Sequence, residues 1–122
     1  MFKRKYLKIT VFNFLCVGIL FSQVPDHWNY SQSDYEYYMT LTAQISVNDN
    51  VVNSPFFMGL FLGNDCRGYS EAVEVNDGQY VYFVVIYGNI QDMASFMNIK
   101  LYDAENDVEY PADQQLMFIP NV

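Results

Sequence analysis

The feature that most constrains the fold of this chain is an apolar residue at every second position of several short segments. In residues 38–45 the apolar members are Met39, Leu41, Ala43 and Ile45, and in residues 95–102 they are Met97, Ile99 and Leu101. Successive side chains of a strand point to opposite faces, so this alternation is typical of strands that bury one face. The polar residues between them are then expected to face water.

Further strands are indicated by short runs of β-branched and aromatic residues between turn signals. We expect them over residues 56–62, 69–75, 80–87, 108–110 and 115–119, with turns at 48–50, 76–79 and 103–107 and a short helical turn within 90–95. The run 80–87, YVYFVVIY, is apolar throughout and predicts a central strand buried on both faces. About seven strands predict an all-β fold, a single antiparallel β-sandwich that is Ig-like or jelly-roll-like.

Residues 1–22 have the pattern of a signal peptide, which leaves residues 23–122 as the β-sandwich domain. The leader has a basic start (Lys3, Arg4, Lys5 and Lys8), an apolar segment over 9–21 and the small residue Ser22 at its end. The apolar segment is shorter than the ~20 residues of a membrane span, so we favour cleavage over an uncleaved N-terminal anchor. We therefore expect an exported protein without a transmembrane segment after cleavage.

Removal of the leader would make an acidic chain more acidic. The whole chain has six basic and fourteen acidic residues and a net charge of −8. Residues 23–122 keep two basic residues, Arg67 and Lys100, against all fourteen acidic ones, which gives −12. Such a charge repels nucleic-acid phosphates and anionic lipid headgroups, so neither is an expected partner. The aromatic content of 18% is typical of a folded domain and unlike that of disordered acidic chains.

The segment GNDCRG, formed by Gly63, Asn64, Asp65, Cys66, Arg67 and Gly68, is the strongest candidate for a special site. We expect a tight turn between two strands, with Cys66 tucked under the sheet as a small apolar residue. Arg67 is expected to clamp a neighbouring loop, with Asp103 or Glu71 as its partner, and a ligand-binding arginine is the alternative.

Reactive roles for Cys66 are weaker interpretations. The only histidine is His27, and nothing in the sequence places it beside this thiol, so a catalytic Cys–His pair is not favoured. One cysteine and one histidine are too few for a zinc site. An intermolecular disulfide in an oxidising compartment stays open as an alternative.

An aromatic cluster near the start of the domain is a second candidate site. It comprises Trp28, Tyr30, Tyr35 and Tyr37, which is followed by Tyr38. These rings are the possible ligand-contacting aromatics of a carbohydrate-binding module; the favoured interpretation is that they seal one end of the sandwich. The loops are rich in Asn and Asp oxygens, which leaves calcium as a weak alternative, although no calcium-loop motif is present. We expect no metal site and no other cofactor.

Four stretches together resemble β-sandwich modules of secreted and surface proteins of Bacteroidota. They are YYMTLTA (37–43), GLFLGNDCRG (59–68), YFVVIYGN (82–89) and IKLYDA (99–104). Such modules recur in long multidomain proteins that carry a C-terminal sorting domain for type IX secretion. The resemblance implies a cell-envelope or surface protein and supplies no catalytic residues.

Together these observations predict an exported, non-catalytic interaction module, an accessory subunit that binds another envelope or surface protein. Its location is expected to be the periplasm, the outer-membrane-associated surface or the extracellular space. The contact is expected to use exposed strand edges and hairpin loops. A carbohydrate-binding module is the alternative, and no constellation of residues points to an enzyme.

Overall fold

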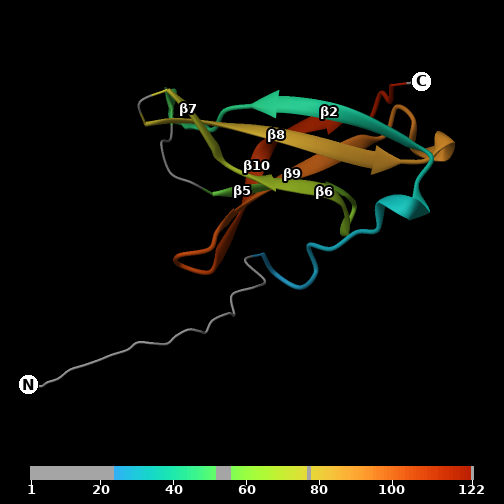
Figure 1. Cartoon of the computed structure of the whole chain (residues 1–122), viewed down its shortest axis with the longest axis horizontal. Coiled ribbons are helices and arrows are strands. Elements are labelled where there is room, and N and C mark those ends of the chain that lie inside the picture. The colour runs from blue at the N-terminus through green and yellow to red at the C-terminus, as the bar shows by residue number, and fades with distance from the viewer. Residues whose placement is uncertain (1–23, 52–55, 77, 122) are drawn as a thin grey trace, which may run out of the picture.

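The computed structural model describes residues 24–51, 56–76 and 78–121, and these ranges form an all-β fold (Figure 1). Two antiparallel sheets of four and three strands stack as layers, which confirms the predicted two-sheet architecture. Within these ranges no helix has the length and apolar character needed to cross a bilayer. The predicted signal peptide, residues 1–22, lies outside the described residues.

The four-stranded sheet has the order β10-β9-β5-β6. Its strands are β5 (Phe57–Leu62), β6 (Asp65–Glu71), β9 (Phe96–Asp103) and β10 (Val108–Met117). The three-stranded sheet has the order β2-β8-β7, with β2 (Tyr37–Ala43), β7 (Val73–Asn76) and β8 (Gln79–Gly88). A separate hairpin joins β3 (Ser46–Val47) to β4 (Asn50–Val51), and the turn between them was predicted.

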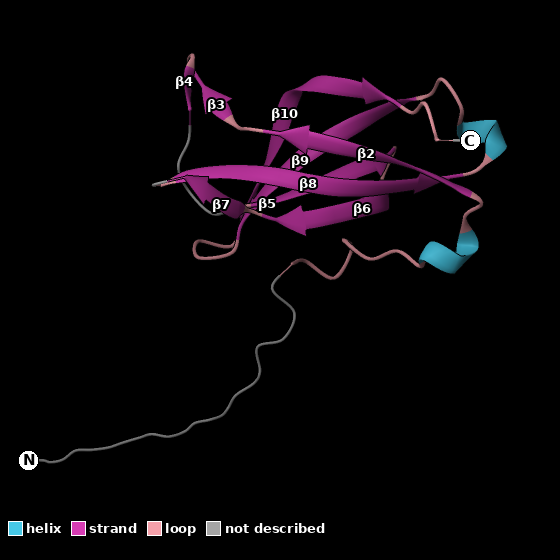
Figure 2. Ribbon diagram, turned by 45° about the horizontal axis from the view of Figure 1, so that its top comes forward, coloured by secondary structure: helices cyan, strands magenta, loops and turns pink. Residues whose placement is uncertain are grey.

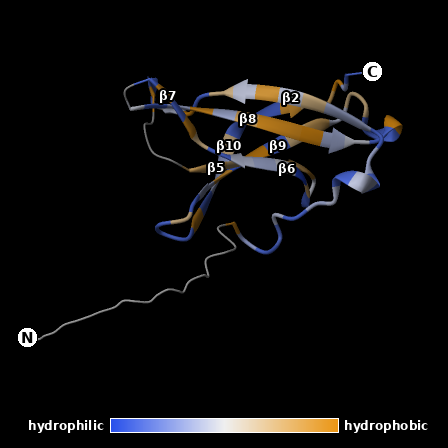
Figure 3. Ribbon diagram, in the orientation of Figure 1, coloured by the Kyte–Doolittle hydropathy of each residue, from blue (hydrophilic) through white to orange (hydrophobic). Residues whose placement is uncertain are grey.

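The main core fills the space between the two sheets. Its buried members are Met39, Ile45, Met58, Leu60, Tyr82, Val84, Ile86, Met97 and Phe118. The period-two pattern therefore predicted the inward faces of β2 and β9 correctly. In Figure 3 the apolar colour is concentrated along β8, whose long run of β-branched and aromatic residues supplies three members of this core.

The strand that is buried on both faces is β5. The prediction that β8 would be buried on both faces was wrong. Every β5 residue from Phe57 to Phe61 is buried, because Trp28 and its neighbours cover the outer face of the four-stranded sheet. In β8 burial alternates, and Phe83 and Val85 are 51% and 39% exposed. On the corresponding outer face of the three-stranded sheet, the described residues Tyr30 and Tyr35 cover Tyr87, whereas Phe83 and Val85 stay exposed.

The GNDCRG segment is mostly strand, so its prediction as a turn was wrong for four of its six residues. Only Gly63 and Asn64 form the turn, where Gly63 has a φ of +64°, and β6 begins at Asp65. After β6 the chain crosses to the other sheet through Ala72 alone and continues as β7. Strands that switch sheets in this way form the corners of sandwiches.

Gly68 lies at the point where β6 crosses the backbone of β8. A Cβ atom built on Gly68 would lie 2.1 Å from the carbonyl oxygen of Val85, so only glycine fits. A second close approach lies at Gly59, where a Cβ would be 2.8 Å from the Trp28 ring. Both glycines let chain segments approach more closely than any side chain would allow.

The C-terminal strand continues through Pro111, where the sequence predicted two short strands. β10 pairs with β9 on both sides of a register shift between Pro111 and Gln115. Proline is tolerated there because β10 is an edge strand and the shift forms a bulge. The two 3₁₀ turns, η3 (Gln32–Asp34) and η4 (Ile90–Asp92), lie at the same end of the molecule (Figure 2), and η4 matches the expected helical turn.

We expect Gly68→Ala to lower the free energy of unfolding by about 1–3 kcal/mol, because the new methyl group must displace the backbone of β8. Gly63→Asn is the control, since nothing lies within 4 Å of that position and asparagine tolerates its positive φ. Urea unfolding followed by tryptophan fluorescence measures both changes. Equal stability of Gly68→Ala and the unchanged chain would contradict the close crossing.

Candidate functional site

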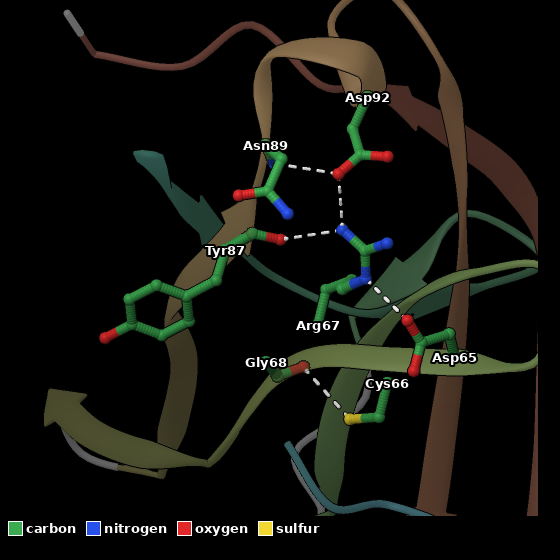
Figure 4. Close-up of polar contacts among 7 residues, drawn as sticks. All are labelled: Asp65, Cys66, Arg67, Gly68, Tyr87, Asn89 and Asp92. Carbon is green, nitrogen blue, oxygen red and sulfur yellow. Dashed lines mark hydrogen bonds and ion pairs between the residues drawn. The ribbon is translucent and has the colours of Figure 1, made fainter. Parts of the chain in front are cut away.

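Arg67 is the centre of a buried ionic group that joins β6 to the loop after β8. Its Nη1 donates to Asp92 Oδ2 at 2.8 Å and to the carbonyl oxygen of Tyr87 at 3.3 Å, and its Nε donates to Asp65 Oδ2 at 2.9 Å (Figure 4). The predicted partners, Asp103 and Glu71, were therefore wrong. Asp103 instead accepts hydrogen bonds within its own turn, from Glu105 N and the Asn106 backbone and side chain.

Asp92 anchors its own loop and the arginine at once. Its Oδ2 accepts hydrogen bonds from Arg67 Nη1 and, at 2.7 Å, from the backbone N–H of Asn89, the N-cap residue of η4. Burial raises the pKa of this carboxyl group, but the hydrogen bonds and the charge of Arg67 outweigh burial and leave the pKa below its ordinary 3.8. Asp92 is therefore ionised at neutral pH.

Asp65 differs from Asp92 in its exposure. The side chains of Arg67 and Asp92 are 9% and 10% exposed, whereas that of Asp65 is 59% exposed. Water screens the Arg67–Asp65 pair and leaves the Arg67–Asp92 pair in a low-dielectric site. The two aspartates contact the same guanidinium and form a matched pair for experiment.

Cys66 is 1% exposed and packs on the outer face of the four-stranded sheet, among Trp28, Phe57, Phe61 and Tyr102. Burial raises the pKa of its thiol to about 11, so the thiol is protonated at neutral pH and is a poor nucleophile. His27 is exposed and its Nε2 pairs with Glu109 Oε2 at 2.8 Å. Cys66 is therefore not accessible to the thiol of a partner protein, and His27 is not placed to act as its base.

Trp28 is a core residue, and its geometry does not fit the sugar platform considered from the sequence. The side chain is 1% exposed, and its ring packs edge-on against Phe61 with centroids 5.3 Å apart. Its Nε1 donates to Glu109 Oε1 at 3.2 Å. Tyr37 also points inward and packs against the main core. Trp28 therefore covers the outer face of the four-stranded sheet, and Tyr37 packs against the core between the sheets.

Tyr30 and Tyr35 belong to a partly exposed stack of rings that includes two tyrosines the sequence did not single out. Tyr87 lies between them, with centroids 5.6 Å from Tyr30 and 6.5 Å from Tyr35, and Tyr69 meets Tyr30 edge-on. The guanidinium of Arg67 lies 4.7 Å from the Tyr35 centroid, a cation–π contact that joins the stack to the ionic group. Tyr69 and Tyr87 lie in β6 and β8, and the strand pattern alone does not reveal this contact.

A shallow depression adjoins this stack. It has a volume of about 290 Å³ and is lined by Trp28, Asn29, Tyr30, Gln32 and Tyr69. It is open to solvent, and Tyr30 and Tyr35 are partly covered by the stack itself. Among the described residues, no group of three or more His, Cys, Asp or Glu side chains is arranged to hold a metal ion.

The outer face of the three-stranded sheet carries several exposed apolar side chains. We call it the apolar face; its members are Tyr38, Thr40, Thr42, Val73, Phe83 and Val85. Phe83 and Val85 stand opposite Thr42 and Thr40 in the β2–β8 pairing. The exposed fractions of Tyr38, Val73 and Phe83 are 48%, 45% and 51%. The sequence missed this surface because it predicted β8 as fully buried.

Comparison of the chain with family models, with curated proteins and with solved structures gave no match. The Arg67 group connects elements of the fold, and the apolar face is exposed.

We expect Arg67→Ala to lower the free energy of unfolding by about 3–5 kcal/mol, because it leaves Asp92 buried without its partner charge. Asp65→Asn is the matched control and should cost less than about 1 kcal/mol, since that pair is exposed. Denaturant unfolding of both variants at pH 7 measures the difference. Similar losses for the two variants would contradict a clamp formed with Asp92.

The pH dependence of this clamp follows from the lowered pKa of Asp92. A carboxyl group with a lowered pKa in the folded state stabilises the protein above its ordinary pKa of 3.8 and loses that effect as the pH falls through the folded value. The stability difference between the unchanged chain and Asp92→Asn should therefore be full at pH 7 and shrink below about pH 4. A difference that stays constant from pH 7 to pH 2.5 would exclude the ionised carboxylate as the cause.

Proposed function

We propose that this chain is an exported, non-catalytic interaction module that binds another envelope or surface protein through the apolar face. The observation that carries the proposal is the exposure of Phe83 and Val85, two residues apart on β8, with Tyr38 diagonally across from Val85 on β2. Strand residues of a one-sided sheet ordinarily place polar side chains toward water. A contiguous exposed apolar patch is typical of a protein-binding surface.

The chemistry of the rest of the molecule supports a binding role. The thiol of Cys66 is buried and protonated, and Arg67 is engaged with two aspartates and a backbone carbonyl. We propose that Arg67 and the GNDCRG segment hold the end of the sandwich rigid beneath the binding surface. Rigid scaffolds reduce the ordering cost of association. Export to the periplasm, the outer-membrane-associated surface or the extracellular space, and an Ig-like or jelly-roll-like classification, belong to the same proposal.

A photo-crosslinking amino acid at position 83, in the chain produced in its own organism, tests this proposal. We expect one discrete protein adduct, because Phe83 is half exposed at the middle of the apolar face. Phe96 is the matched control, a strand phenylalanine that is 56% exposed on the other sheet. An adduct at position 96 alone, equal adducts at both positions, or none at either would overturn the proposed binding surface.

A carbohydrate-binding module is the second candidate, favoured by the open depression that Tyr30 and Tyr69 line. It ranks below protein binding because the rings of Tyr30 and Tyr87 stack on one another and Trp28 is buried. If glycans bind there, Tyr69→Ala should lose binding on a glycan array. Tyr110→Ala should keep it, since Tyr110 is exposed on β10 and does not line the depression. Absence of any glycan signal for the unchanged chain would remove this candidate.

A further inference from the structure

The edges of the two sheets are protected to very different degrees. An edge strand presents unpaired N–H and C=O groups, and proteins usually block such edges against pairing with another chain. The outer edge of β6 is blocked by β8, because Arg67 donates to the Tyr87 carbonyl oxygen and Gly68 lies against that of Val85. This edge is therefore closed by the fold itself.

Two further edges carry features that prevent pairing. β10 contains Pro111, which lacks a donor, and a register shift before Gln115 with Asp113 between them. β7 has only four residues, Val73–Asn76, and its pairing with β8 also shifts register. Short strands, bulges, prolines and charges are the usual means of protecting an edge.

The outer edge of β2 has none of these protections over its described length. All seven residues from Tyr37 to Ala43 pair with β8 without a register shift, and none is proline or charged. The carbonyl oxygen of Tyr38 accepts a hydrogen bond from Asn121 N at 2.8 Å, in an antiparallel bridge. Among the described residues this is the one backbone pairing at the outer edge of β2.

The bridge also shows which backbone groups point outward. In an antiparallel strand the N–H and C=O groups of one residue point to the same side, and residues two apart share that side. Since the Tyr38 carbonyl faces away from β8, those of Thr40 and Thr42 do so too, together with their N–H groups. The side chains of both threonines belong to the apolar face, so a strand added here would extend that face.

We propose that β2 receives an extended, basic segment of the partner protein as an additional strand at Thr40 and Thr42. This inference rests on the proposed function and specifies how the partner is held. The basic character follows from charge complementarity, since residues 23–122 hold fourteen acidic and two basic residues. The same net charge disfavours a second copy of this chain at the edge. Backbone hydrogen bonds supply affinity, and alternate side chains supply specificity.

Amide hydrogen exchange of the purified chain tests the proposal with a short peptide that alternates valine and lysine. In the free chain the amides of Thr40 and Thr42 should exchange faster than those of Leu41 and Ala43, which point toward β8. With peptide at ten times its Kd, exchange at Thr40 and Thr42 should slow about tenfold, because only the unbound fraction exchanges. A peptide that alternates valine and glutamate should give no protection.

Two variants control for the backbone contact. Thr40→Pro removes an outward N–H group and should abolish peptide binding, while an edge position tolerates proline. Thr40→Val keeps the N–H group and should bind as the unchanged chain does. Thermal melting establishes that each variant is folded. If Thr40→Pro does not fold, the exchange measurement on the unchanged chain decides whether the peptide pairs with the edge of β2.

Each remaining outcome overturns the inference in a distinct way. Binding without protection of Thr40 and Thr42 would place the peptide elsewhere, and absence of binding would exclude a basic strand at this edge. Protection that grows with protein concentration alone would identify a second copy as the occupant. The crosslink at position 83 tests the proposed function separately. An adduct there without slowed exchange at Thr40 and Thr42 would support protein binding and exclude strand addition at β2.

Discussion

The crossing of β6 over the backbone of β8 is the contact on which the rest of the structure depends. It joins the two sheets at one side, where Gly68 admits the Val85 carbonyl oxygen and Arg67 reaches Asp92 and the Tyr87 carbonyl oxygen. The neighbouring residue Cys66 faces the opposite side and packs in the second apolar cluster. One short strand therefore provides the closest backbone contact, the buried ion pair and part of a core. Because these three roles occupy adjacent residues, a change at any of them is transmitted to both sheets.

The outer faces of the two sheets are covered to different degrees, and this difference leaves the apolar face exposed. Trp28 and the segment before β2 cover the outside of the four-stranded sheet, which makes β5 the strand buried on both faces. On the three-stranded sheet the described residues cover the outer face at Tyr87 and leave Phe83 and Val85 exposed, although β8 is rich in β-branched and aromatic residues. The mismatch between the composition of β8 and its exposure is the physical basis for assigning a binding role to this side.

The sequence predicted the fold class and most strands because period-two patterns report which face of a strand meets the core. It predicted β9 and the inward face of β2 by this signal, and the turn at residues 48–50 by its side-chain chemistry. It wrongly predicted that β8, and not β5, is covered on both faces, because a continuous apolar run does not reveal whether another segment packs over it. The sequence also could not identify the acidic partner of Arg67, since no local pattern distinguishes Asp92 among fourteen carboxylates. The strand character of residues 65–68 was hidden by Asn64, Asp65 and Gly68, which have turn propensity but different roles in the folded chain.

The unequal protection of the sheet edges has a consequence for assembly. Growth of a filament by strand pairing requires two open edges on each molecule, one to receive a neighbour and one to offer to the next. Here Pro111 and the bulge close the flank at β10, while β6 is occupied by β8. Among the described strands β2 alone presents an open edge, so a stack of this kind ends after one addition and the shape of the sandwich favours a complex of fixed and small stoichiometry.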